Sequence, residues 1–212
     1  VRGEEAGFEG RRLRLEWPRS RIPVLIAADG PRGLRLAGEV ADGAVVGMGL
    51  LPETMKAARE FIRQGAEGVG RGAESLQVWF RAACAIAPDR LQALEMAKPA
   101  LAATAHHSFR GSLEGKQVPP HLVEAVGALM RGYRVEEHNR PGPDNWNARL
   151  IDDLGLTDYL AQRFGLLGTP EEVAGRIQAL ARHGVTHLTL RPMNPDRQGF
   201  LRLWKGEVLP RL

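Results

Sequence analysis

The sequence predicts an α/β protein with a parallel sheet. Three observations support this: a short apolar run at Pro23–Ala28, a glycine turn at Gly30 that opens a helix, and a second apolar run at Ala44–Val46. Two buried strands joined by one short helix imply parallel pairing, because a parallel connection needs such a crossover. The unbroken apolar character of the first run is typical of a strand covered on both faces.

The elements around this unit follow from local patterns. Residues 1–20 are polar, and Phe8–Leu15 predicts a small hairpin. Gly30 is the expected cap residue of the first core helix, and Pro31 suits its first position. Apolar residues at spacings of three and four then predict an amphipathic helix from Thr54 to about Gln64.

The longest predicted strand is Leu76–Ile86, in which apolar residues alternate along one face. Asp89–His106 predicts an alanine-rich helix, and Pro99 is expected to kink or interrupt it. Residues 108–165 have a different character, rich in Gly, Pro, His, Asn and charge, with short helical pieces near His121–Gly132 and Asp152–Arg163. A segment of this length is typical of a lid or an insertion within a domain.

Regular structure is predicted again at the carboxyl-terminal end. Thr169 and Glu172 form a capping box around Pro170. A strand is expected at Val185–Leu190 and a closing helix at Gly199–Leu209. The prediction is therefore one domain over residues 1–212, with four strands each followed by a helix and the insertion at 108–165. Four such units fit an open doubly wound sheet or half of an eight-stranded barrel.

Composition limits the classes of partner. The 29 Lys and Arg and 25 Asp and Glu residues give a net charge of +4, scattered along the chain without a basic stripe. Nucleic-acid binding is therefore not expected, nor is a membrane span, which needs about 20 consecutive apolar residues. The single cysteine, Cys84, excludes an internal disulfide and a multi-cysteine metal site. We expect no metal and a cytoplasmic location.

The turn at Gly30 is the leading candidate for a binding site. A glycine turn that opens a helix presents free N–H groups and the positive end of the helix dipole, which suit a phosphate. The alternative is a strand-to-helix turn that binds nothing. Arg81 and Arg191 lie on or beside strands, where they face the mouth of a barrel or are simply paired elsewhere.

The histidines carry weaker hypotheses. His106 and His107 are adjacent, so on a helix they point about 100° apart and are poor joint metal ligands. His138 lies in the insertion, where a substrate contact and a solvated loop position are the alternatives. His187 in the last strand is expected to pack, and Cys84 is expected to be a small core residue.

Four stretches together resemble the bacterial-luciferase-like oxidoreductases, a family of flavin-dependent monooxygenases and deazaflavin-dependent reductases. They are the segments 23–31, 36–43, 164–173 and 184–190, with sequences PVLIAADGP, LAGEVADG, FGLLGTPEEV and GVTHLTL. The resemblance implies a (β/α)8 TIM barrel. This chain would supply its carboxyl-terminal half, strands five to eight, as a fragment of a longer barrel.

The resemblance also implies where a cofactor lies. The family's phosphate loop maps onto Ala28, Asp29, Gly30, Pro31, Arg32 and Gly33, and the end of the next strand, which lines the substrate, maps onto Gly47. The implied cofactor is FMN or the deazaflavin coenzyme (F420), and the catalytic residues remain unassigned. Asp29 departs from the Ser or Gly usual in the family. Its carboxylate repels a phosphate unless Arg32 or Arg35 offsets it, or it caps the helix itself.

The implied function is a luciferase-like monooxygenase or reductase that acts on a small organic substrate. The alternative is a non-catalytic cofactor-binding or assembly protein that completes its barrel by association. Four βα units alone leave open sheet edges, and such edges pair with other chains. We therefore expect a homo-oligomer, or pairing with a missing amino-terminal half.

Overall fold

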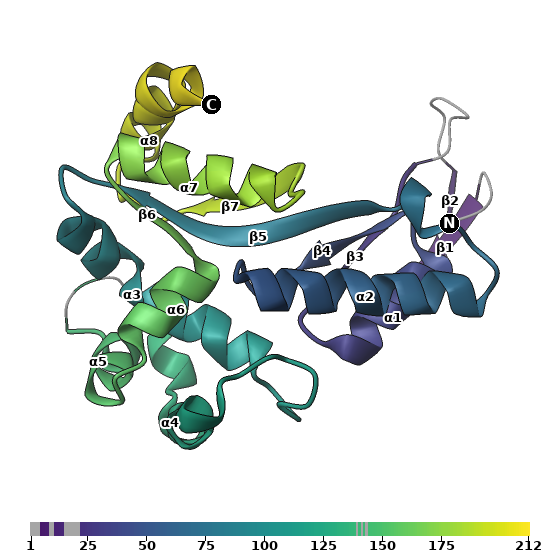
Figure 1. The fold of residues 1–212 in the computed structure, drawn as a ribbon, viewed down its shortest axis with the longest axis horizontal. Helices are drawn as coiled ribbons and strands as arrows, with labels where there is room; N and C mark the ends of the chain where they lie inside the picture. Colours follow the sequence, from purple (N-terminus) through teal and green to yellow (C-terminus); the bar gives the residue numbers. More distant parts are fainter. Residues whose placement is uncertain (1–4, 9–10, 15–21, 139, 141, 143) are drawn as a thin grey trace.

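A parallel sheet is the centre of the fold (Figure 1). The computed structural model describes residues 5–8, 11–14, 22–138, 140, 142 and 144–212. The sheet consists of β3 (Leu25–Ala28), β4 (Gly43–Val46), β5 (Gln77–Ile86), β6 (Gly165–Gly168) and β7 (His187–Pro192). Every described pairing within this sheet is parallel, as the sequence predicts.

The long strand β5 organises the sheet. Its first residues pair with β4, so that Gln77 lies opposite Gly43, and its last residues pair with β6. Residues Trp79–Cys84 of β5 pair with β7. This stretch includes residues that also pair with β4 and residues that also pair with β6. Since a strand has two edges, β7 occupies one edge, and β4 and β6 share the other.

The predicted count of four core strands is wrong, because the sheet contains a fifth, β6. It consists of two leucines between two glycines and follows a helix directly. Four residues are too few to show the alternation of a strand or the three-to-four-residue spacing of a helix. The pairing of β6 with β5 forms only in the folded chain. It begins at Gly165, where the predicted insertion ends.

The remaining elements lie close to their predicted places. The amino-terminal hairpin consists of β1 (Glu5–Phe8) and β2 (Arg11–Arg14), which pair antiparallel, and its predicted turn lies outside the described residues. The helices of the insertion are α4 (Val123–Gly132), α5 (Trp146–Asp153) and α6 (Thr157–Phe164), so the piece expected at 152–163 is two helices. The other helices are α1 (Pro31–Val40), α2 (Pro52–Gly68), α3 (Arg90–Ser108), α7 (Pro170–Arg182) and α8 (Arg197–Leu203).

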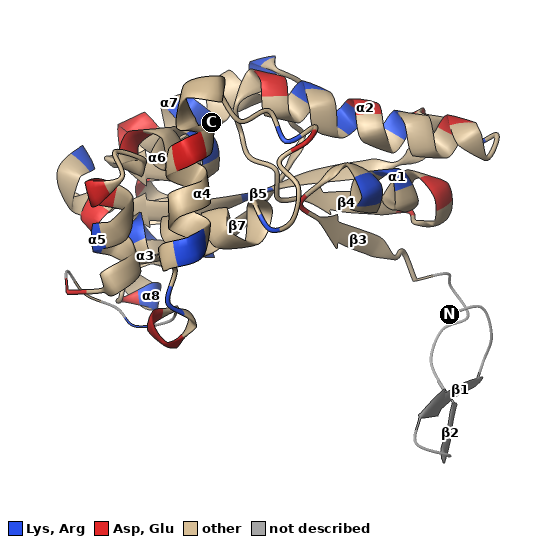
Figure 2. Ribbon diagram, turned by 90° about the horizontal axis from the view of Figure 1, so that it is seen from below, with Lys and Arg blue, Asp and Glu red and all other residues tan. Residues whose placement is uncertain are grey.

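Helices α1 and α2 approach each other through glycines. A Cβ atom at Gly38 would lie 2.1 Å from the Ile62 carbonyl oxygen, and one at Gly65 would lie 2.0 Å from the Arg35 carbonyl oxygen. The backbones therefore contact directly. The outer surface of α2 carries both signs of charge (Figure 2), including the ion pair of Arg63 with Glu60 at 2.6 Å.

Two hydrophobic cores lie on the two faces of β5. Phe80 and Cys84 point into the first core, with α1, α2 and α7. Ala83 and Ala85 point into the second, with the group of helices α3 to α6, which lies at the other end of the sheet from α1 and α2 (Figure 1). Helix α3 continues without interruption through Pro99.

Part of the sheet is open. Ala27 of β3 is exposed, as are His187 and Thr189 of β7, so the expectation that the first strand is covered on both faces is wrong. No described element packs on this part of the face, whose other end carries the second core, and Ala27 therefore remains accessible there. In the described part of the chain, β3 and β7 also have no partner strand on their outer edges. No helix among the described residues is long and apolar enough to cross a membrane.

Candidate functional site

The amino-terminal end of α1 presents backbone amides to the carboxyl end of β3. The first amide of this region that hydrogen-bonds to the chain is that of Leu34, which donates to the Gly30 carbonyl at 3.1 Å. Within the described residues, the amides of Gly30, Arg32 and Gly33 donate no hydrogen bond, and no side chain caps the helix. Since Pro31 has no N–H, three donors remain available for a ligand.

Gly33 also brings α1 close to the strand that precedes it. A Cβ atom at Gly33 would lie 3.0 Å from the Cβ atom of Ala28, which is buried at the end of β3. A larger residue would push the first turn of the helix outward. The predicted phosphate-loop residues therefore form a compact strand-to-helix turn, as expected.

A buried lysine lies beside this turn. A Cβ atom at Gly30 would lie 3.2 Å from Cε and 3.9 Å from Nζ of Lys116, whose side chain comes from the predicted insertion. Lys116 is only 6% exposed, and its ammonium donates to the Arg110 carbonyl at 2.7 Å. Burial lowers its pKa, as does the charge of Arg163, whereas the carboxylate of Asp29 raises it. No sequence pattern points to Lys116, because it lies in a segment without periodicity.

Asp29 is neutralised by a residue from a different strand. Its Oδ1 atom accepts a hydrogen bond from Nη2 of Arg81 at 3.0 Å. The predicted partners Arg32 and Arg35 are not used, and Asp29 does not cap α1. Arg35 instead donates to Gln64 of α2 at 3.1 Å, so the expectation that a neighbour in the chain offsets Asp29 is wrong. Arg81 is both paired and close to the carboxyl end of β3.

Gly47 lies against this ion pair. A Cβ atom at Gly47 would be 1.7 Å from Oδ1 of Asp29 and 2.6 Å from Nη2 of Arg81. The pair therefore fits only because position 47 has no side chain. The structure thus brings the predicted substrate-side residue next to the predicted phosphate loop.

Arg163 holds the surrounding segments together. It is fully buried, and its guanidinium donates to the carbonyl oxygens of Met48 at 2.8 Å, Lys116 at 2.6 Å and Gln117 at 3.1 Å. It also donates to the Tyr159 hydroxyl. Among the described residues it forms no ion pair, and burial lowers its pKa. Arg163 therefore fixes the loop after β4 and the backbone that carries Lys116.

A cluster of aromatic polar side chains lies on α3 and on the segment after α4. The Tyr133 hydroxyl lies 2.6 Å from Nδ1 of His138. The ring of His106 stacks on that of Tyr133, with centroids 4.0 Å apart, and the rings of His107 and His138 meet edge to face at 5.7 Å. The two adjacent histidines thus point to different neighbours, as predicted. We call these four residues the Tyr–His cluster.

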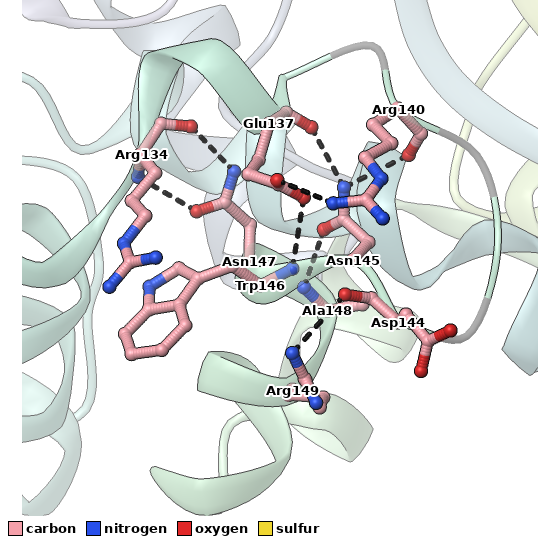
Figure 3. A network of polar contacts seen from close by, with 9 residues as sticks. All are labelled: Arg134, Glu137, Arg140, Asp144, Asn145, Trp146, Asn147, Ala148 and Arg149. Atoms are coloured by element: carbon pink, nitrogen blue, oxygen red, sulfur yellow. Dashed lines mark hydrogen bonds and ion pairs between the residues drawn. The ribbon is translucent and has the colours of Figure 1, made fainter.

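Two buried asparagines fix the segment that carries Tyr133 and His138 (Figure 3). Asn147 accepts from the Arg134 amide and donates to the Arg134 carbonyl, both at 2.8 Å. Asn145 donates to the carbonyls of Glu137 and Arg140 and accepts from the Ala148 amide. These hydrogen bonds hold the described residues 134–138 in a defined arrangement beside the start of α5.

Other candidates contribute little. A cavity of about 340 Å³ lies between α6, β6 and the start of α7, lined by Leu51, Arg90 and Glu172 among others. It contains none of the predicted site residues, and Glu172 is already committed to its capping box.

Cys84 is a core residue whose pKa burial raises to about 12. The described residues contain no group of three side chains able to hold a metal.

The chain is similar to F420-dependent enzymes. It is 28% identical over 211 residues to the 5,10-methylenetetrahydromethanopterin reductase of Archaeoglobus fulgidus, covering 99% of this chain and 60% of that protein. It is 26% identical to the F420-dependent glucose-6-phosphate dehydrogenase of Nakamurella multipartita, covering 99% of this chain and 56% of that one.

Solved structures agree with these relatives. The coenzyme F420-dependent tetrahydromethanopterin reductase of Methanopyrus kandleri superimposes with a TM-score of 0.60 at 25% identity, over 89% of this chain and 50% of that one. This chain therefore spans between half and three fifths of the length of these three proteins. The family model of the luciferase-like monooxygenases matches residues 1–187. The chain belongs to the luciferase-like monooxygenase family.

Proposed function

We propose that this chain is part of an oxidoreductase that binds FMN or coenzyme F420 and holds the cofactor phosphate at the amino-terminal end of α1. One observation carries the proposal: the free amides of Gly30, Arg32 and Gly33 lie beside the buried ammonium of Lys116. Buried cations are normally paired with anions, yet Lys116 has a carbonyl oxygen as its hydrogen-bond acceptor. A phosphate would supply the missing negative charge.

The chemistry of the donors fits a phosphate monoester. Backbone amides at a helix start and an ammonium group are common phosphate ligands, and α1 adds its dipole. The carboxylate of Asp29, the feature that argues against an anion here, is offset by Arg81 at 3.0 Å. The exposed guanidinium of Arg32, in the first turn of the helix, favours an anion further.

The relatives favour coenzyme F420 over FMN, since the reductases and the dehydrogenase similar to this chain depend on it. When bound, such a cofactor supplies the hydride acceptor or donor, while the protein supplies orientation and electrostatics. The residues proposed to hold it are Gly30, Arg32, Gly33 and Lys116. Gly47 would lie on the substrate side. The substrate is proposed to be a small organic molecule, and the location cytoplasmic.

We further propose that β3, β4, β5 and β7 correspond to strands five to eight of a TIM barrel. The support is their parallel order, the free outer edges of β3 and β7, and the exposed face that includes Ala27 and Thr189. The remaining strands would come from an amino-terminal half or from a second copy. Sedimentation of this chain tests the proposal: a dimer or a mixed complex supports completion, and a stable monomer contradicts it.

A comparison of FMN with riboflavin tests the phosphate site, because the two flavins differ only in the phosphate. Flavin fluorescence is followed during titration with the protein. We expect FMN to bind at least about tenfold more tightly, which is the value of one charge-assisted hydrogen bond or more. Coenzyme F420 and its phosphate-free deazaflavin form a second pair for the same comparison.

The variant Lys116→Gln sharpens the test. It should weaken FMN binding by about tenfold and leave riboflavin binding unchanged, since only FMN presents a charge to Lys116. Lys205→Gln is the matched control, because this substitution removes the same charge from an exposed lysine in the carboxyl-terminal region. Equal affinity for the two flavins, or equal effects of both variants, would contradict the proposed site.

A further inference from the structure

The Tyr–His cluster faces the same edge of the sheet as the proposed phosphate site. The pKa of His107 responds to the charges of Asp29 and Arg81, and the charge of Arg191 opposes the rise in the pKa of Tyr133 that burial causes. Asp29 follows the last residue of β3 and Arg191 lies near the end of β7, whereas Arg81 lies in the middle of β5. Arg191 pairs with Ala83 of β5, which belongs to the second core, against which Tyr133 packs. The cluster is therefore part of the mouth of the sheet, although its residues come from the insertion and from α3.

The hydrogen-bond partners determine what His107 presents. Nη2 of Arg110 lies 3.4 Å from Nδ1 of His107. A guanidinium group can only donate, so Nδ1 accepts, and the ring proton of neutral His107 is on Nε2. Partial desolvation of the His107 ring and the charge of Arg110 both lower its pKa, so the neutral ring is favoured, although the residue remains accessible to a ligand. Its free nitrogen is thus a hydrogen-bond donor.

The same reasoning applies to His138. The Tyr133 hydroxyl keeps its proton, because burial raises its pKa, and its oxygen lies 2.6 Å from Nδ1 of His138, to which it can donate. In that arrangement the proton of a neutral His138 ring is on Nε2. The two imidazole rings meet edge to face with their centroids 5.7 Å apart, so both are close enough to contact one ligand.

The cluster is held in place before any ligand arrives. His106 stacks on Tyr133 with their ring planes 8° apart. The fully buried amides of Asn145 and Asn147 fix the backbone between Tyr133 and His138 (Figure 3). An ordered arrangement that leaves His107 exposed and His138 half-buried is suited to binding, since little entropy is lost when a ligand docks.

The surrounding charge is positive. Arg110 and Arg191 are exposed, and within the described residues neither forms an ion pair, whereas Asp29 is neutralised by Arg81. We propose that Nε2 of His107 and of His138, together with Arg191, bind an oxyanion group of the substrate, a carboxylate or a phosphate. A set of donors without acceptors favours such a group over a neutral hydroxyl or amide. The inference rests on the proposed function only in placing the substrate near the carboxyl ends of β3 and β7.

The test is nitrogen NMR of the protein labelled in its histidine rings, titrated with inorganic phosphate and, separately, with sodium acetate. We expect the Nε2 resonances of His107 and His138 to shift saturably. His121, His183 and His187 lie elsewhere and serve as controls in the same spectrum. Shifts of equal size in the control rings, or no shift in His107 and His138 with either ion, would overturn the inference.

Two variants test the assigned roles. Tyr133→Phe removes the hydroxyl that fixes His138 and should weaken phosphate binding at the rings about fivefold, the value of one hydrogen bond. Arg191→Gln should weaken it by a similar factor. His121→Asn is the matched control and should have no effect. The unchanged ring shifts of His183 and His187 report that each variant is folded.

The backbone amides separate this inference from the proposed function. Phosphate that shifts the Gly30 and Gly33 amides but not the rings of His107 and His138 supports the phosphate loop and overturns the substrate site. Phosphate that shifts the rings but not these amides supports the substrate site and contradicts the phosphate loop. Lys116→Gln should raise the phosphate concentration needed for the amide shifts and leave the ring shifts unchanged.

Discussion

The carboxylate of Asp29 occupies the space that a side chain at Gly47 would need, with its Oδ1 atom 1.7 Å from the Cβ position. Arg81 holds the carboxylate there at 3.0 Å. Gly47 is buried, so a larger residue could not move toward solvent. Because Gly47 has no side chain, the carboxylate of Asp29 can lie beside the proposed phosphate loop while paired with Arg81.

Gly47→Ala should destabilise the protein by about 1–3 kcal/mol, the usual cost of overpacking a buried position. Urea denaturation measures the loss. In an Asp29→Ala background the same substitution should cost clearly less, because the clashing carboxylate is gone and the two effects are not additive. Gly175→Ala is the control: its Cβ atom meets nothing within 4 Å, and it should be neutral or stabilising. Equal losses in both backgrounds would contradict the close contact.

Arg163→Met should cost about 2–4 kcal/mol, because the buried carbonyl oxygens of Met48 and Lys116, and the part-buried one of Gln117, lose their donor. Arg182→Met at an exposed position of α7 is the control. The midpoint of urea unfolding measures both. A variant at position 163 that is as stable as the control would show that the guanidinium does not hold these segments.

The binding of a phosphate-bearing ligand should weaken as the pH rises. Burial lowers the pKa of Lys116, so its ammonium loses its proton at a lower pH than an exposed lysine does. A phosphate monoester is already fully charged above about pH 7. The ratio of FMN to riboflavin affinity should therefore fall, in the native protein, at a lower pH than the titration of an ordinary lysine, whose pKa is about 10.4, would give. In Lys116→Arg it should stay constant, because arginine remains charged; a constant ratio in both proteins would contradict the role of Lys116.

Cys84 should be unreactive in the folded protein. It is fully buried, and its pKa is raised to about 12, so the thiolate that reacts is scarce at neutral pH. A thiol-specific disulfide reagent at pH 8 should modify it at least about a hundredfold more slowly than in urea. Since the folded-state pKa is above the unfolded value, stability should fall as the pH rises from about 9 toward 12. Rapid modification of the native protein would show that the first core is open.

The features that the sequence predicts correctly are those decided by residues that are neighbours in the chain. Helix α1 begins at Pro31 after Gly30, and α7 begins at a capping box between Thr169 and Glu172, because the residues that decide these starts are neighbours in the chain. The phosphate loop was predicted for the same reason. The family resemblance, which rests on these local motifs, is confirmed by the family model.

The missed features depend on contacts between distant segments. Strand β6 is defined by its pairing with β5 rather than by its own composition. Lys116 reaches Gly30, and Arg81 reaches Asp29, across separations of more than fifty residues, and no periodic pattern records such a meeting. The sequence shows His138 as a single loop histidine, because its hydrogen bond to Tyr133 depends on the fold of an irregular segment.

The central claim is that the amides at the start of α1 bind a phosphate. The most direct measurement is the backbone amide NMR spectrum of the chain during titration with FMN and, in parallel, with riboflavin. The account predicts saturable shifts of the Gly30, Arg32 and Gly33 amides with FMN alone. Shifts that are the same for both flavins, or that leave these three amides unmoved while FMN binds elsewhere, would contradict it.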